Sequence, residues 1–159
     1  MERLDRKRLL AGAGVGAAGL LAAPAVAGAG GDDRRHPAEG TWLAHVTGTL
    51  PDGTQLDAFG MGVYLRGGVA LEIASITPAP SYGAWKARSR RRFRARFRRF
   101  RFTAAGAPAG FEEGVLNARV DADGDSFRGQ GLIQGYDQGG AAVGTAVEVR
   151  LEATRFTVD

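Results

Sequence analysis

The sequence predicts an all-β fold with about eight antiparallel strands in an up-and-down closed barrel, preceded by a signal peptide. Segments of alternating apolar and polar residues follow one another from residue 40 to residue 156. Glycine-rich turns separate these segments, and no helical periodicity occurs after residue 30. Closure removes exposed strand edges, which favours a barrel over the alternative, a β-sandwich. Glycines within the strands also favour a barrel, because they permit tight bending.

Residues 1–29 are predicted to be an export signal peptide that resembles the twin-arginine type. A basic segment (residues 1–8) precedes an uncharged stretch rich in Ala, Gly and Leu (residues 9–23). The residues Asp5-Arg6-Lys7-Arg8-Leu9-Leu10 are similar to the twin-arginine consensus, with Lys7 in place of one arginine. The general secretory route is the alternative. Ala25-Val26-Ala27 has the small-x-small pattern of a cleavage site, so we expect cleavage after Ala27 or Ala29 and a secreted protein.

The apolar stretch of the signal is too short and too rich in glycine for a transmembrane anchor, which needs about 20 strongly apolar residues. Residues 30–39 are small, polar and interrupted by proline, and we expect a flexible leader there. Residues 40–159 are predicted to form one barrel domain. The chain contains no cysteine, so this domain is held by its core without disulfides.

The first half of the domain is predicted to hold four strands, at residues 40–47, 57–65, 69–73 and 83–90. The sequences Pro51-Asp52-Gly53 and Arg66-Gly67-Gly68 predict turns between them. Two prolines in residues 77–82 predict a loop, because proline interrupts strand pairing.

The second half is predicted to hold strands at residues 92–103, 112–121, 126–137 and 141–156. In the first of these strands the apolar residues change phase after Phe97, which predicts a β-bulge near Arg98–Arg99. Asp123-Gly124 is typical of a two-residue hairpin turn of the primed type, and Gln138-Gly139-Gly140 predicts another turn.

Several short motifs resemble those of lipocalin-like small barrels. They are Gly40-Thr41-Trp42, Gly83-Ala84-Trp85, Asp125-Ser126-Phe127-Arg128-Gly129, Tyr136-Asp137 with Gly139, and the closing Arg155-Phe156. The pattern over residues 40–156 is similar to exported actinobacterial β-barrel proteins of the calycin and allene-oxide-cyclase-like type. The resemblance implies a barrel whose interior holds a small apolar ligand, and it transfers no catalytic residue.

Candidate cavity residues follow from the apolar alternation. We expect Trp42, Phe59, Met61, Leu71 and Trp85 to face inward, and Tyr64 and Glu72 to face outward. Polar groups near the barrel mouth are expected from Tyr82, Asn117 and Tyr136. These residues suit a ligand cavity and a filled core equally well.

A cationic row is predicted on the outer face of residues 92–103. Nine arginines lie between residues 88 and 101, and those at alternate positions point away from the apolar residues: Arg92, Arg94, Arg96 and Arg98. They are candidates for weak binding of polyanions, and a simply solvated face is the alternative. Intracellular nucleic acid is not expected as a partner, because the chain carries an export signal.

No catalytic residue, metal site or cofactor is predicted. His36 and His45 are nine residues apart without other ligands at motif spacing, and no nucleophile motif occurs. The leading hypothesis is a non-catalytic binding module for a small apolar or amphipathic ligand. The alternatives are a cofactor-free isomerase or cyclase of the allene-oxide-cyclase-like type and a structural envelope protein that binds anionic polymers. A buried carboxylate with a raised pKa inside the cavity would favour the isomerase.

Overall fold

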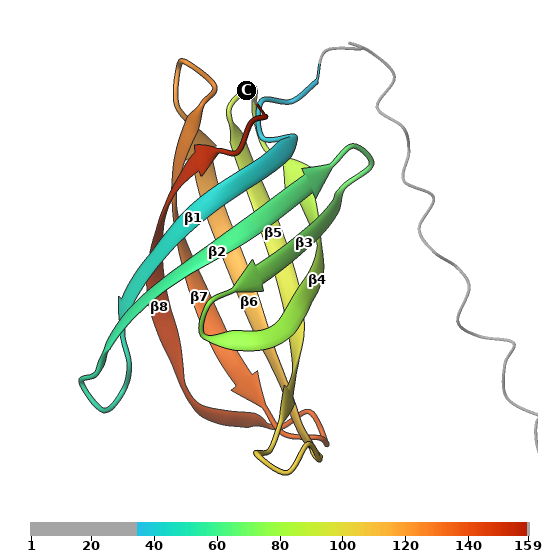
Figure 1. Ribbon diagram of the computed structural model, residues 1–159, viewed down its shortest axis with the longest axis vertical. Helices are drawn as coiled ribbons and strands as arrows, with labels where there is room; N and C mark the ends of the chain where they lie inside the picture. Colours follow the sequence, from blue (N-terminus) through green and yellow to red (C-terminus); the bar gives the residue numbers. More distant parts are fainter. Residues whose placement is uncertain (1–34, 159) are drawn as a thin grey trace, which may run out of the picture. The chain divides into compact units, whose positions relative to one another are not determined.

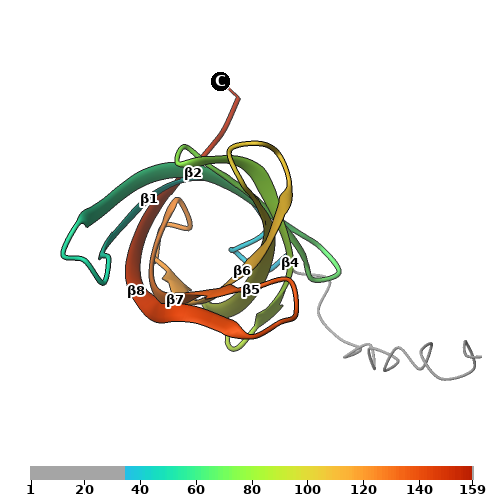
Figure 2. The same cartoon turned by 90° about the horizontal axis from the view of Figure 1, so that it is seen from below.

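The computed structural model describes residues 35–158, which form a closed barrel of antiparallel strands (Figures 1 and 2). The strands are β1 (Gly40–Thr49), β2 (Gln55–Leu65), β3 (Val69–Ala74), β4 (Thr77–Ala87), β5 (Arg92–Phe102), β6 (Pro108–Val120), β7 (Ser126–Tyr136) and β8 (Ala142–Arg155). Each strand pairs with the next in sequence, and β8 pairs with β1. The predicted fold class is confirmed, whereas the predicted signal peptide lies outside the described residues.

The connections between strands are short. Gly53 (φ 86°) and Gly67 (φ 90°) adopt the left-handed conformation that the predicted turns require. The link between β6 and β7 is longer than the predicted two-residue turn, because β6 ends at Val120 and β7 begins at Ser126. Within this link, the backbone N–H of Asp125 donates to Asp123 Oδ1 over 3.0 Å. No helix in residues 35–158 is long and apolar enough to cross a membrane.

The predicted loop at residues 77–82 is wrong, since these residues form the first part of β4. β4 pairs with β5 only from Tyr82, opposite Arg98, to Ala87, opposite Phe93. Residues 77–81 therefore lack a β5 neighbour on one edge, and the two prolines in this segment remove no ladder hydrogen bond on that side. The first part of β4 is strongly curved (Figure 1).

The predicted bulge in β5 lies elsewhere. β5 and β6 keep a regular register through Arg99 opposite Glu112 and Phe100 opposite Phe111, and the register shifts only between Phe100 and Phe102. The inward phase of Phe93, Ala95 and Phe97 thus continues with Arg99, whose side chain is 16% exposed. The apolar pattern was misleading because Phe100 and Phe102 are exposed.

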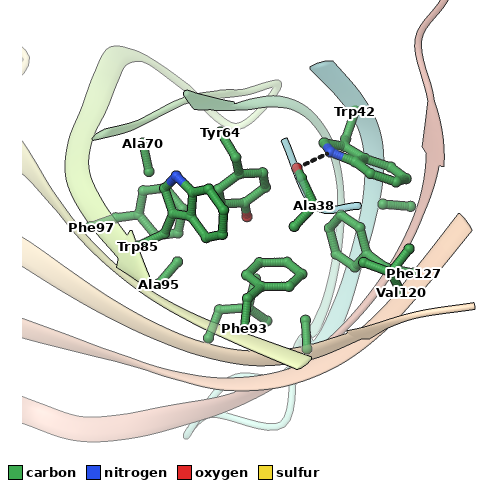
Figure 3. Close-up of a cluster of buried hydrophobic side chains, with 13 residues drawn as sticks. Ala38, Trp42, Tyr64, Ala70, Trp85, Phe93, Ala95, Phe97, Val120 and Phe127 are labelled. Carbon is green, nitrogen blue, oxygen red and sulfur yellow. Dashed lines mark hydrogen bonds between the residues drawn. The ribbon is translucent and has the colours of Figure 1, made fainter. Parts of the chain in front are cut away.

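One end of the barrel is filled by aromatic rings (Figure 3). Trp42 and Phe127 meet edge to face with ring centres 4.9 Å apart, and Tyr64 meets Phe93 at 5.0 Å. Trp85 belongs to the same cluster and donates its indole N–H to the Leu65 carbonyl over 2.8 Å. These residues lie near the strand ends on one side of the barrel, so this end is a packed core.

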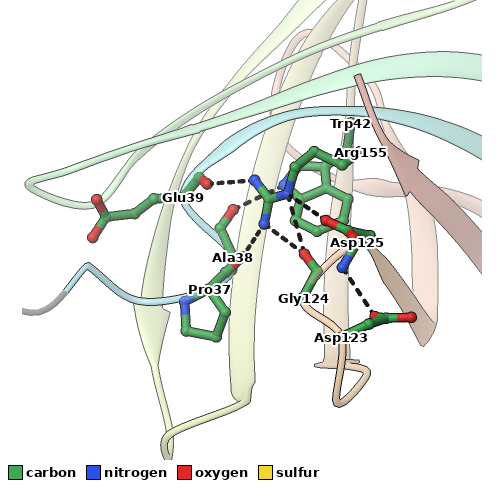
Figure 4. A network of polar contacts seen from close by, with 8 residues as sticks. All are labelled: Pro37, Ala38, Glu39, Trp42, Asp123, Gly124, Asp125 and Arg155. Carbon is green, nitrogen blue, oxygen red and sulfur yellow. Dashed lines mark hydrogen bonds and ion pairs between the residues drawn. The ribbon is translucent and has the colours of Figure 1, made fainter. Parts of the chain in front are cut away.

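The residues before β1 cover the same end (Figure 4). Ala38 is fully buried and accepts a hydrogen bond of 2.9 Å from Trp42 Nε1. Arg155, near the end of the chain, donates to the carbonyls of Pro37 (2.7 Å), Glu39 (3.0 Å) and Gly124 (2.7 Å). Its guanidinium lies 4.2 Å from the centre of the Trp42 ring. Residues 36–39 are therefore part of the barrel domain and not of the predicted flexible leader.

The apolar alternation assigns β2 and β3 to the wrong face. Phe59 was expected inside and is 64% exposed, whereas the inward positions of β2 are small: Ala58, Gly60 and Gly62. Further exposed apolar side chains lie on the same side of the barrel: Leu43, Leu65, Val69, Ile73 and Tyr82. Small residues occupy these inward positions, whereas Tyr64 of the same strand joins the aromatic cluster.

Candidate functional site

Beyond the packed aromatic end, the barrel interior contains a cavity. The cavity has a volume of about 80 Å³, and Trp42, Tyr64, Phe97 and Phe127 contribute to its lining. Its apolar walls come mainly from Val46, Leu116, Ile133, Val149 and Leu151, with glycines on β2, β6 and β7. A Cβ atom built on Gly114 would meet nothing within 4 Å. The missing side chain at Gly114 therefore contributes to this space.

Glu72 supplies a carboxylate to this cavity. It lies on β3, opposite Gly62 of β2 and Ser81 of β4, and it lines the cavity. Among the described residues, none forms a hydrogen bond or a close ion pair with its carboxylate. Burial raises the pKa of Glu72, and the charge of Arg99 opposes that rise. An uncharged Glu72 is thereby favoured.

Two hydroxyl groups line the same cavity. Tyr64 and Ser81 are both more than nine-tenths buried, at 3% and 5% exposure. Burial, and secondarily the negative charge of Glu72, raises the pKa of Tyr64, so its phenol is neutral. Each hydroxyl can donate and accept a hydrogen bond toward a molecule in the cavity.

Arg99 and Glu112 complete the polar side of the cavity. They are register neighbours on β5 and β6 and form an ion pair through Arg99 Nη2 and Glu112 Oε2. Arg101 Nε lies 3.7 Å from the other oxygen of Glu112, and its side chain is 40% exposed. Two arginines thus share one carboxylate, while the Glu72 carboxylate lies apart from this pair.

The structure gathers only part of the predicted cavity residues. Trp42 and Met61 line the cavity, and Trp85 lies in the aromatic cluster beside it. Phe59 and Tyr82 are exposed, and Leu71 lies on the outer face between Val63 and Tyr82. Asn117 is exposed on β6, and Tyr136 stacks on Phe111 at 4.9 Å.

Tyr64 and Glu72 were expected outside and face the interior instead. Sequence reasoning also missed Ser81, Arg99 and Glu112. One usable signal was present for Tyr64: it shares the phase of Ala58, Gly60 and Gly62, and such a run of small residues is typical of a crowded inner face.

The predicted cationic row lies on the outer face of β5, between β4 and β6 as expected. Arg92, Arg94, Arg96 and Arg98 are all exposed. Arg96 and Arg98 both bind Glu113 of β6, and these hydrogen bonds lower the pKa of its carboxyl group. The Arg98 guanidinium also lies 4.3 Å from the centre of the Phe111 ring. One acidic residue therefore neutralises part of the row.

No family model matches the chain, and a search of curated proteins finds no match. The fold is compatible with a lipocalin-like barrel: a closed set of eight antiparallel strands around a hollow interior. Within residues 35–158, no group of three or more His, Asp or Glu side chains is placed to hold a metal ion. The function is therefore argued from the cavity itself.

Proposed function

We propose that the barrel is a non-catalytic binding module that holds one small amphipathic molecule in its interior cavity. The observation that carries this proposal is the division of the cavity into an apolar wall and a polar side with an unpaired carboxylate, Glu72. This carboxylate lines the cavity and has no partner among the described residues, so a ligand there can bond to it directly. An apolar cavity wall gains by contact with an apolar ligand surface.

The cavity volume limits the ligand. About 80 Å³ is far less than the roughly 300–1,000 Å³ of pockets for drug-sized molecules. The ligand we propose therefore has only a few non-hydrogen atoms. Its apolar part would lie against Leu116, Ile133 and Val149, and its polar end near Tyr64 and Glu72.

Native mass spectrometry of the full chain purified from its own host tests this proposal. We expect a co-purified small molecule, lost in the variant Gly114→Leu because the new side chain enters the open space beside Gly114. Asn117→Leu is the matched control, since it adds the same side chain to an exposed position of the same strand. A protein that carries no molecule, with Gly114→Leu unchanged in every respect, would contradict the proposal.

A second candidate function is a cofactor-free isomerase. The specific observation in its favour is that Glu72 combines burial, a raised pKa and a cavity position beside the Tyr64 hydroxyl. A carboxyl group with a raised pKa can exchange a proton with a bound substrate. The test is whether the molecule recovered from the native protein is converted to an isomer. If Glu72→Gln abolishes this conversion without abolishing binding, the protein is an isomerase and not a non-catalytic binding module.

We also propose that the module works outside the cytoplasm. The support is the sequence of residues 1–29, with its basic start, its weakly apolar stretch and its small-x-small site. N-terminal sequencing of protein from the culture medium should begin at Gly28 or Gly30. A chain that retains Met1 in a membrane fraction would contradict export and cleavage.

A further inference from the structure

The charges around the cavity do not balance when Glu72 is neutral. Glu112 carries one negative charge and is shared by Arg99 and Arg101. The groups that face Glu72 from the neighbouring strands are Tyr64 on β2 and Ser81 on β4, both uncharged, with Arg99 and Glu112 across the cavity. When Glu72 carries a proton, Arg99, Arg101 and Glu112 together hold one excess positive charge, part of which Arg101 contributes from a 40% exposed position.

We propose that the cavity takes a small monocarboxylate, bound by Arg99 and the Tyr64 hydroxyl, together with a proton on Glu72. This inference rests on the proposed binding function and names its ligand class. The carboxylate would neutralise the excess positive charge, and the apolar walls would cover its short alkyl chain. Arg99 suits this role because only its Nη2 is engaged by Glu112, which leaves further N–H groups in its planar fork.

The available donors support an anion rather than a cation. Tyr64, Ser81 and a protonated Glu72 can each donate a hydrogen bond, and Arg99 can only donate. A cationic ligand would have to displace the proton from Glu72 while lying in the same small cavity as Arg99. A ligand carboxylate in the cavity would have hydrogen-bond donors on several sides. The negative charge of Glu112 also lies there, but it is already paired with Arg99.

Proton coupling follows from this arrangement. If Glu72 loses its proton, the interior set becomes neutral without a ligand, and the new negative charge repels a carboxylate in the same cavity. Binding of the anion should therefore be accompanied by uptake of one proton wherever free Glu72 is ionised. Affinity should fall about tenfold for each unit of pH above the pKa of Glu72.

Propionate is the probe we choose, because it joins a short alkyl chain to one carboxylate. Propionamide is its neutral counterpart of similar shape, and propylammonium is the cationic comparison. Calorimetric titration of the full chain in buffers of different ionisation heat measures affinity and proton uptake together. We expect propionate to bind at least tenfold more tightly than propylammonium at pH values where Glu72 is protonated, and its affinity to decline at higher pH.

The variants separate the roles of the two charged residues. Glu72→Gln keeps the shape of the side chain but cannot ionise, so propionate affinity should become independent of pH above the titration of propionate itself. Arg99→Gln should lower propionate affinity at least tenfold and leave propionamide unchanged, with Arg99→Lys as a second variant that keeps the charge. Arg96→Gln, an exposed position of the same strand, is the control and should change neither.

Each failure has its own meaning. If Glu72→Gln retains the pH dependence of the wild type, the proton is not held on Glu72 and the inference is overturned. A second outcome is that propionamide or propylammonium binds, that propionate does not, and that Gly114→Leu abolishes the binding. The proposed binding function is then supported, but the ligand is not an anion and the inference is overturned. If none of the three probes binds and no molecule accompanies the native protein, the proposed function fails as well.

Discussion

The two ends of the barrel each hold a partly buried arginine, and the contacts of these arginines differ. At the packed end, Arg155 donates to the carbonyls of Pro37, Glu39 and Gly124 and lies against the Trp42 ring. At the hollow end, Arg99 has one carboxylate partner, Glu112, and faces open space. The first arginine is surrounded by partners that the chain itself supplies. The second retains unused donors, which is the condition for binding another molecule.

The largest effect is expected at the packed end. Arg155→Leu removes every hydrogen bond that this guanidinium makes and leaves carbonyls of the barrel end without donors. We expect a loss of about 3 kcal/mol in the free energy of unfolding, measured by denaturant titration of the full chain. Arg150→Leu, an exposed position on the same strand, should cost less than about 0.5 kcal/mol. Equal losses for the two variants would show that Arg155 does not hold this end together.

Substitutions at two glycines, Gly129 and Gly114, allow a direct comparison of tightly packed and open parts of the barrel interior. A Cβ atom on Gly129 would lie 2.6 Å from Leu116 Cδ1 and 3.0 Å from the Asn117 carbonyl oxygen, whereas Gly114 has open space. Gly129→Ala should therefore cost about 1–3 kcal/mol through overpacking. Gly114→Ala should instead gain about 0.5 kcal/mol, because alanine restricts the unfolded chain. Thermal or denaturant unfolding of both variants tests the difference, and similar losses would mean that the cavity is not open.

The dependence of stability on pH should reveal the unpaired carboxylate. The pKa of Glu72 is raised above its ordinary value of 4.5, so above that value the folded chain binds more protons than the unfolded chain. Stability should accordingly decrease as pH rises through this window, up to the raised pKa. Glu72→Gln should remove that slope and stabilise the protein by about 1 kcal/mol at pH 8, since no charge is then buried. A slope that is unchanged in the variant would contradict an enclosed Glu72.

The smallest effect is expected on the outer surface, where Glu113 pairs with Arg96 and Arg98. Glu113→Gln should cost less than about 1 kcal/mol, because water screens these ion pairs. It should also free two arginines of the predicted cationic row and raise the salt concentration needed to elute the protein from heparin. Replacing Arg92, Arg94, Arg96 and Arg98 by Gln should lower that concentration. Elution that is indifferent to both changes would mean that the row is only a solvated face.

The sequence was sufficient for the fold, because alternation and glycine turns are local signals that recur along the chain. It was insufficient for the site. Phe59 and Leu71 mark the apolar face of their strands, yet that face is outside, and the inner face of β2 and β3 carries small residues together with Tyr64 and Glu72. The pairing of Arg99 with Glu112 depends on the register between two strands, which no pattern within either strand reveals.

The packed end also determines when the barrel end can close during synthesis of the chain. Its cover is built from residues 36–39 and held by Arg155, whose hydrogen-bond partners Pro37 and Glu39 lie 118 and 116 residues earlier in the chain. A growing chain therefore cannot close this end until residue 155 has been made, and contacts of such long range form slowly. A chain that stops before residue 155 lacks the donor that joins β8 to the cover, so it cannot close the barrel end in this way.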